Sequence, residues 1–117
     1  MGGSIAGEVR ARLEPRRQEM VDLLAELVGI ESGSDDPAGL MELAGRLEEL
    51  FGEFGTLTRH PLGPDGAPHL SLTVLGAEPD VAPVVVLGHY DTVWSRGTLA
   101  RMPLRIEDGV LAGPGSF

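Results

Sequence analysis

Residues Val84–Leu87 form a run of four consecutive large apolar side chains in a chain of 117 residues. A strand with one face in water alternates apolar and polar side chains, whereas an unbroken apolar run is typical of a strand buried on both faces. We therefore predict that Val84–Leu87 is the central strand of a sheet covered by helices. On this interpretation the chain has an α/β fold, and Val84–Leu87 is its most buried run.

His89 and Asp91 follow directly after this predicted strand. In open α/β sheets ligands bind beyond the carboxyl ends of the strands. Residues two apart in an extended chain point to the same side, which would bring the imidazole and the carboxylate together. Such a pair can bind a metal, with the carboxylate fixing the orientation of the imidazole ring. His89 and Asp91 are therefore the candidate functional residues.

Composition excludes several classes of function. The chain has 18 acidic and 9 basic residues, for a formal net charge of −9. Nucleic acids and anionic membranes both require a basic face, so neither is an expected partner. The absence of cysteine excludes disulfides and thiolate metal sites. Residues Met1–Ala6 lack the features of a secretory leader, and no apolar run is long enough to cross a bilayer, so we predict a cytoplasmic protein.

Two helices are predicted in the first half of the chain. Residues 1–7 are glycine-rich and are expected to be flexible. An apolar stripe extends from Val9 to Val28, and Pro15 should break or kink it, which leaves a firm helix from Pro15 to about Val28. A stripe of this kind is either a core face or a partner-binding face, and its ordinary width favours a core face. Asp36-Pro37 is an N-terminal cap signal for a second helix that stops at Gly55.

Two hairpins are predicted in the remaining chain. A weak strand over residues 56–62 and an alternating strand over 70–74 flank a turn at 63–66, and they are expected to pair directly or through a neighbour. Residues 104–107 and 110–112 flank Asp108-Gly109, a dipeptide that favours a tight turn because both residues accept positive φ angles.

Several other side chains invite a functional reading, but a structural one is favoured for each. The histidines outside the candidate pair lack an acidic or histidine companion at ligand spacing, so we expect them at the surface. The two aromatic residues near His89 are expected to pack or to line the site. The arginines after it are expected to have surface or structural roles, because none has a second group at convergent spacing. These residues are His60, His69, Tyr90, Trp94, Arg96, Arg101 and Arg105.

One extended pattern resembles a known family. His89-Tyr90-Asp91-Thr92-Val93 follows the apolar run and precedes Gly97, then Asp108-Gly109 and Gly113-Pro114-Gly115. This order resembles the dinuclear zinc exopeptidases, a family that includes glutamate carboxypeptidase, aminoacylase and related deacylases. The similarity is greatest to the glutamate carboxypeptidase branch. The similarity extends from about Leu23 to Phe117. Besides the residues already named, the matching segments are Glu31-Ser32-Gly33-Ser34, Trp94, Leu99-Ala100 and Pro103-Leu104-Arg105.

The resemblance implies a fold and a role for both candidate residues. Residues 1–117 would be an incomplete catalytic domain, the N-terminal portion of an α/β/α three-layer domain with a mixed sheet. His89 matches the first zinc ligand, and Asp91 matches the catalytic carboxylate that orients an active-site imidazole. Such enzymes hold two zinc ions, or other divalent metals, and use a glutamate as general base. They cleave an amide or peptide bond next to a terminal carboxylate, in a small peptide or an N-acyl amino acid.

The same resemblance limits what the chain is expected to do alone. In the family the remaining metal ligands, the general base and a second domain come after the segment that matches residues 113–117, and a homodimer is the expected assembly of the complete protein. A zinc site generally needs at least three protein ligands, and here only His89 is identified. The sequence therefore supports two hypotheses: a fragment of a zinc-dependent hydrolase, or a catalytically inactive domain that acts as a structural or interaction module.

Overall fold

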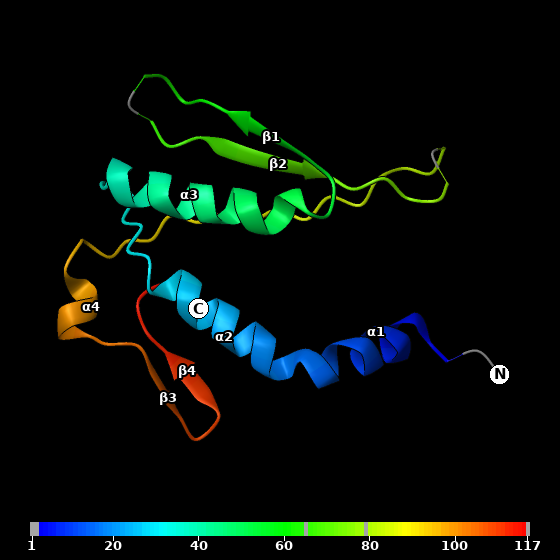
Figure 1. Ribbon diagram of the computed structural model, residues 1–117, viewed down its shortest axis with the longest axis horizontal. Coiled ribbons are helices and arrows are strands. Elements are labelled where there is room, and N and C mark those ends of the chain that lie inside the picture. The colour runs from blue at the N-terminus through cyan, green and yellow to red at the C-terminus, as the bar shows by residue number, and fades with distance from the viewer. Residues whose placement is uncertain (1–2, 65, 79, 117) are drawn as a thin grey trace.

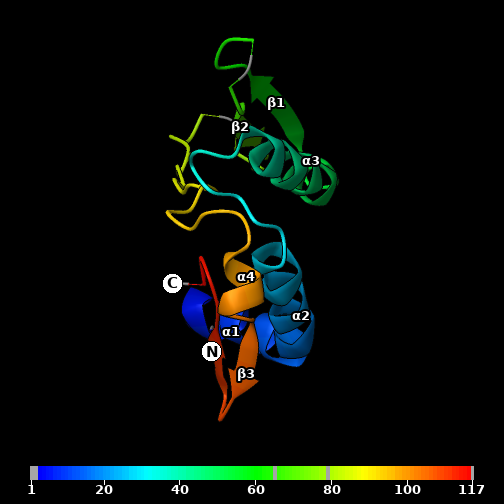
Figure 2. The ribbon, with the colours of Figure 1, turned by 90° about the vertical axis from the view of Figure 1, so that its left-hand side faces the viewer.

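The computed structural model describes residues 3–64, 66–78 and 80–116. Parts of three predicted features lie outside these residues: the start of the flexible segment 1–7, Asp65 in the first turn, and Phe117. The described chain combines helices with two separate two-stranded antiparallel sheets, so its mixed α and β character is as predicted. Its radius of gyration is 16.9 Å, whereas a compact domain of this length has about 13 Å. The arrangement is therefore open, and its principal extents of 52 × 42 × 19 Å make it flat (Figures 1 and 2).

The N-terminal region is a helical rod in three pieces. Helix α1 spans Ile5–Leu13, a 3₁₀ turn η1 spans Glu14–Arg16, and helix α2 spans Arg17–Val28. The turn contains Pro15, which confirms the predicted interruption. Within the segment expected to be flexible, residues 5–7 form the first turn of α1, and Ser4 caps the helix by accepting a hydrogen bond from the Gly7 N–H at 3.2 Å. A serine cap satisfies a free N–H group of the first turn and so allows the helix to start early.

Helix α3, Pro37–Gly52, contributes most of the small core. Asp36 caps it through a bond from the Gly39 N–H, as predicted, and the helix ends three residues before the predicted stop at Gly55. The buried hydrophobic core of the described chain consists of Val28 of α2 and the α3 residues Leu40, Leu43 and Ala44.

Both predicted hairpins are confirmed. Strand β1, Thr56–His60, pairs antiparallel with β2, His69–Thr73, and this hairpin packs on α3 (Figure 1). Strand β3, Arg105–Glu107, pairs with β4, Val110–Ala112. The second turn has φ angles of 51° at Asp108 and 76° at Gly109, the positive values that the dipeptide predicted. A short helix α4, Thr98–Arg101, was not predicted and precedes this hairpin.

The predicted central strand is absent. Residues Val84–Leu87 have no regular secondary structure and are 80–93% exposed, so this run is among the least buried of the described chain instead of the most buried. Figures 1 and 2 show it within an irregular trace outside both hairpins. A strand forms only where a neighbour accepts and donates its backbone hydrogen bonds, and neither described sheet extends to this run. Apolar composition alone therefore did not determine its structure.

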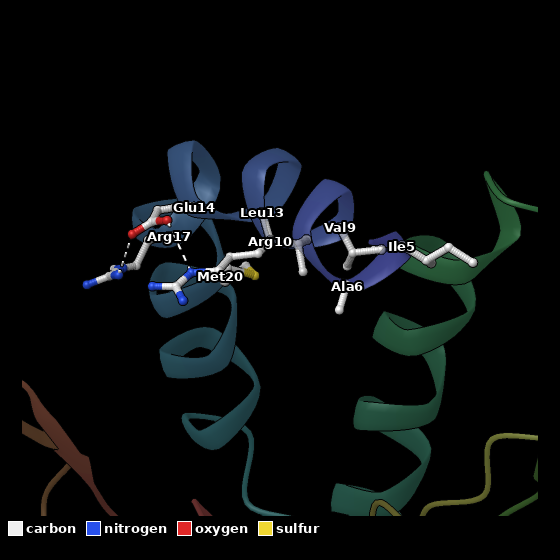
Figure 3. Close-up of a pocket in the computed structure, with 8 residues that line it drawn as sticks. All are labelled: Ile5, Ala6, Val9, Arg10, Leu13, Glu14, Arg17 and Met20. Carbon is white, nitrogen blue, oxygen red and sulfur yellow. Dashed lines mark hydrogen bonds and ion pairs between the residues drawn. The ribbon is translucent and has the colours of Figure 1, made fainter. Parts of the chain in front are cut away.

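The predicted core face of the N-terminal helices is also largely exposed. Val9, Leu13 and Met20 are 43–48% exposed, and α1 has no buried residue. The C-terminal end of α2 is the part that reaches the core, through Val28. Figure 3 shows the exposed part as a shallow groove along α1, η1 and the start of α2. Its lining is mainly apolar and includes three charged side chains. The lining residues are Ile5, Ala6, Val9, Arg10, Leu13, Glu14, Arg17 and Met20.

Among the described residues, no helix has both the length and the apolar character needed to span a membrane.

Candidate functional site

The candidate site is built where the connection between α2 and α3 meets the segment that carries His89 and Asp91. Gly33 and Thr92 form an isolated parallel bridge. The Ser34 N–H donates to Thr92 O at 2.8 Å, and the Thr92 N–H donates to Ser32 O at 2.9 Å. A Cβ atom on Gly33 would lie 2.6 Å from Trp94 O, so this close approach requires glycine. Backbone hydrogen bonds thus join two loops that are far apart in the sequence.

Side chains reinforce the same junction. Ser32 is 3% exposed, and its hydroxyl donates to Tyr90 O at 2.9 Å. The hydroxyl of Tyr90 donates to Pro68 O at 2.5 Å, and burial raises the pKa of this phenol. The contact ties the site to the connection that leads into β2.

His89 and Asp91 lie in contact, as their spacing predicted. The Nδ1 atom of His89 is 3.1 Å from Oδ1 of Asp91 and 3.0 Å from the Asp91 backbone oxygen. Both partners are acceptors, so in the neutral ring Nδ1 carries the proton and Nε2 carries the free lone pair. The side chain of His89 is 82% exposed. The pair therefore presents an accessible imidazole nitrogen in the form that binds metals or accepts a proton.

Ser34 holds the other oxygen of the same carboxylate. Its hydroxyl lies 2.7 Å from Oδ2 of Asp91 and 3.0 Å from Thr92 O. This hydrogen bond is the main cause that lowers the pKa of Asp91; burial opposes it, and His89 lowers the pKa further. The carboxylate of Asp91 accepts one hydrogen bond from Ser34 and another from His89, so Asp91 lies between the serine and the histidine.

This arrangement excludes a mechanism in which His89 activates Ser34 as a nucleophile. A serine nucleophile is activated by a base that takes the proton of its hydroxyl, and the usual base is an imidazole nitrogen. Here the Ser34 hydroxyl bonds to Asp91, and the free nitrogen of His89 points elsewhere. The arrangement suits a carboxylate that orients an imidazole, not a serine hydrolase triad.

Two further carboxylates of the α2–α3 connection fix the chain after the site. Glu31 accepts from the Gly97 and Leu99 N–H groups, both at 2.9 Å, at the start of α4. These two bonds lower the pKa of Glu31. Oδ2 of Asp36 is buried without a hydrogen bond of regular geometry, but Arg96 Nη2 lies 2.6 Å away and forms an ion pair with it. The structural role predicted for Arg96 is thus observed.

No group of three or more histidine, cysteine, aspartate and glutamate side chains converges within the described ranges. His60 and His69 are exposed, as predicted, and lie on the β1–β2 hairpin. Two features of these histidines were not predicted: they are direct cross-strand partners, and His60 Nε2 contacts the Ser71 hydroxyl at 2.8 Å.

Comparisons with known proteins found no match to a family model, and neither curated proteins nor solved structures gave a significant match. The assignment of a function therefore rests on the residues and geometry described above.

Two carboxylates of this site, Glu31 and Asp91, have lowered pKa values, which predicts a loss of stability in acid. Stability from a group whose pKa is lowered by folding is fully present above its unfolded pKa, near 4, and is lost as the pH falls through the folded value. We expect the urea concentration at the midpoint of unfolding to decrease as the pH is lowered below about 5. The substitution Glu31→Gln should make that decrease smaller. Glu53→Gln, an exposed control with the same change of charge, should retain it; parallel profiles for all three proteins would contradict the prediction.

Proposed function

We propose that this chain supplies the His89–Asp91 part of a zinc-dependent hydrolase similar to glutamate carboxypeptidases. The enzyme would cleave an amide or peptide bond next to a terminal carboxylate, in a small peptide or an N-acyl amino acid. His89 would be a metal ligand through Nε2, and Asp91 the catalytic carboxylate that orients an imidazole. The described helices and hairpins would be the N-terminal portion of a three-layer domain with a mixed sheet.

The observation that carries this proposal is the geometry of the imidazole. Nδ1 of His89 faces two oxygens of Asp91, and the opposite nitrogen is left free on an exposed ring. Metal-binding histidines commonly donate their other ring N–H to a carboxylate or a carbonyl oxygen, which fixes the ring and raises its basicity. The arrangement of His89 and Asp91 matches that pattern within a segment chosen from sequence alone.

The proposal requires residues beyond these 117. His89 supplies one ligand, and the described residues offer no cluster of three. The other ligands for two zinc ions, or for other divalent metals, and the general base would come from a longer chain. We place that protein in the cytoplasm, without nucleic acid or membrane as partners, and with a homodimer as a possible assembly.

A second candidate function is supported by one observation. The four apolar residues Val84–Leu87 are 80–93% exposed, which is unusual unless another surface covers them. A catalytically inactive domain that uses this run to bind a partner is consistent with that exposure. The reading frame after Phe117 discriminates the two candidates: continuation into an Asp-x-Lys-Gly type of sequence favours the hydrolase, and an immediate stop codon favours the interaction module.

The role of Asp91 gives the first test of the hydrolase. In the longer protein, Asp91→Ala should weaken zinc binding by roughly 10–100-fold, because the ligand ring loses the carboxylate that orients it. Zinc affinity is measured by competition with a chromophoric chelator, alongside hydrolysis of an N-acyl glutamate. Asp80→Ala, at an exposed turn, is the matched control and should bind zinc normally. Unchanged affinity and turnover in Asp91→Ala would refute the role.

A further inference from the structure

We infer that Ser34 is a positioning residue, which sets the orientation and the tautomer of the His89 ring by holding the carboxylate of Asp91. The consequence for metal binding rests on the proposed function, whereas the effect on the ring does not. The inference concerns a residue of the α2–α3 connection that lies 57 positions before the carboxylate it contacts.

The carboxylate needs such a restraint. The side chain of Asp91 is 46% exposed, and it belongs to a segment without regular secondary structure. An exposed carboxylate is otherwise free to rotate between rotamers and to bond with water. Ser34 occupies Oδ2 at 2.7 Å, and this leaves Oδ1 facing Nδ1 of His89 at 3.1 Å. The two bonds together fix which oxygen meets the ring.

Ser34 is itself held in place independently of its hydroxyl. Its N–H donates to Thr92 O at 2.8 Å, next to the bridge between Gly33 and Thr92. The buried Ser32 adds its own hydroxyl contact to Tyr90 O. Loss of the Ser34 hydroxyl alone therefore leaves the backbone junction intact, so an effect on the ring can be separated from an effect on the loop.

The hydroxyl has one proton and two nearby acceptors, Asp91 Oδ2 and Thr92 O. The ionised carboxylate is closer and is the stronger acceptor, because hydrogen bonds to charged groups are shorter and stronger than those to neutral ones. The Asp91 backbone oxygen also faces Nδ1 of His89 at 3.0 Å and remains after any change at Ser34. We therefore expect a partial loss of tautomer preference, not a complete one.

The experiment measures the ring directly. The 117-residue chain is labelled with ¹⁵N only in its three histidine rings and studied by magic-angle-spinning NMR, which tolerates oligomers. The pH is held at about 8.5, where unperturbed histidine is neutral. His89 is assigned from the signal that His89→Gln removes. In the wild-type chain we expect the tautomer with the proton on Nδ1 to predominate at this residue.

Three variants decide the matter. Ser34→Ala should lower the ratio of the Nδ1–H to the Nε2–H tautomer of His89 by roughly three- to tenfold, the effect of losing one partly exposed hydrogen bond to a charged group. Ser34→Thr retains a hydroxyl and should restore the ratio. Ser71→Ala is the matched control, because its hydroxyl contacts His60; it should change the His60 signals and leave His89 unchanged.

Two results would overturn the inference: an unchanged ratio in Ser34→Ala, or a change that Ser34→Thr does not restore. The outcome is separate from that of the proposed function. A tautomer shift in Ser34→Ala, together with a longer protein that binds no zinc, would retain the positioning role and remove the hydrolase. A longer protein that binds zinc and an unchanged ratio in Ser34→Ala would do the reverse.

Discussion

Replacement of His89 by alanine in the longer, zinc-binding protein is expected to remove zinc from one of two positions and to reduce turnover by roughly a thousandfold or more. A catalytic metal contributes several kcal/mol of transition-state stabilisation, and each 1.36 kcal/mol corresponds to about tenfold in rate. His89 is the proposed ligand because its free nitrogen is accessible on a ring that is 82% exposed. Zinc per chain is measured by mass spectrometry, and turnover with an N-acyl glutamate.

The chain provides matched controls for this substitution. His60 and His69 are exposed histidines on the β1–β2 hairpin, and within the described residues neither forms a hydrogen bond with His89 or Asp91. His60→Ala and His69→Ala should each retain full zinc content and turnover. Full zinc occupancy and normal activity in the His89→Ala protein would end the hydrolase hypothesis, whatever the controls show.

Local sequence signals predicted most of the elements, because their causes are local. Pro15 lacks a backbone N–H, and it does interrupt the N-terminal helix. Asp36 caps α3 through its own side chain, three residues from its partner. Asp108 and Gly109 adopt the positive φ angles that a tight hairpin turn needs. In each case the residues that determine the structure are a few positions apart.

The errors concern structure that depends on distant partners. The run Val84–Leu87 has strong strand propensity, but a strand needs a neighbour, and the described chain does not supply one. The exposed stripe on α1 is the helical counterpart of this error: periodicity identifies an apolar face but not what covers it. The Ser4 cap of α1, by contrast, was a local signal that the sequence reading overlooked.

The sequence predicted one contact of the candidate site, between His89 and Asp91, but not the contacts of Ser34 and Glu31. The contact between His89 and Asp91 was predicted from their spacing of two, a local property, and it is observed although the segment has no regular secondary structure. Ser34 and Glu31 were not predicted to reach residues 91–99, because no spacing rule connects positions so far apart. One signal was available: Gly33 between two serines, in a segment already singled out by resemblance, is typical of a backbone that approaches another closely.

The 117-residue chain alone is expected neither to hydrolyse amides nor to hold zinc tightly. His89 supplies one nitrogen, and Asp91 is occupied by Ser34 on one oxygen and by the imidazole on the other. An ion bound by one or two groups keeps most of its water, so it is not held in a defined position. Zinc titration by calorimetry and an assay with an N-acyl glutamate test both statements. A stoichiometric site tighter than about micromolar, or turnover in the ordinary range of about 1 per second or more, would contradict them.

We expect the same isolated chain to self-associate. Its accessible surface is 9163 Å², whereas a folded monomer of this mass exposes about 6,100 Å². Many large hydrophobic side chains are exposed, and Val84–Leu87 carries no charge that would oppose pairing of two copies. Sedimentation velocity should show dimers or larger species at micromolar concentration. Val85→Lys, which places a charge in the run, should shift the distribution towards monomer, while Val9→Lys on α1 serves as the control at a less exposed site. Monomeric wild-type chain would show that exposure of this run does not drive association.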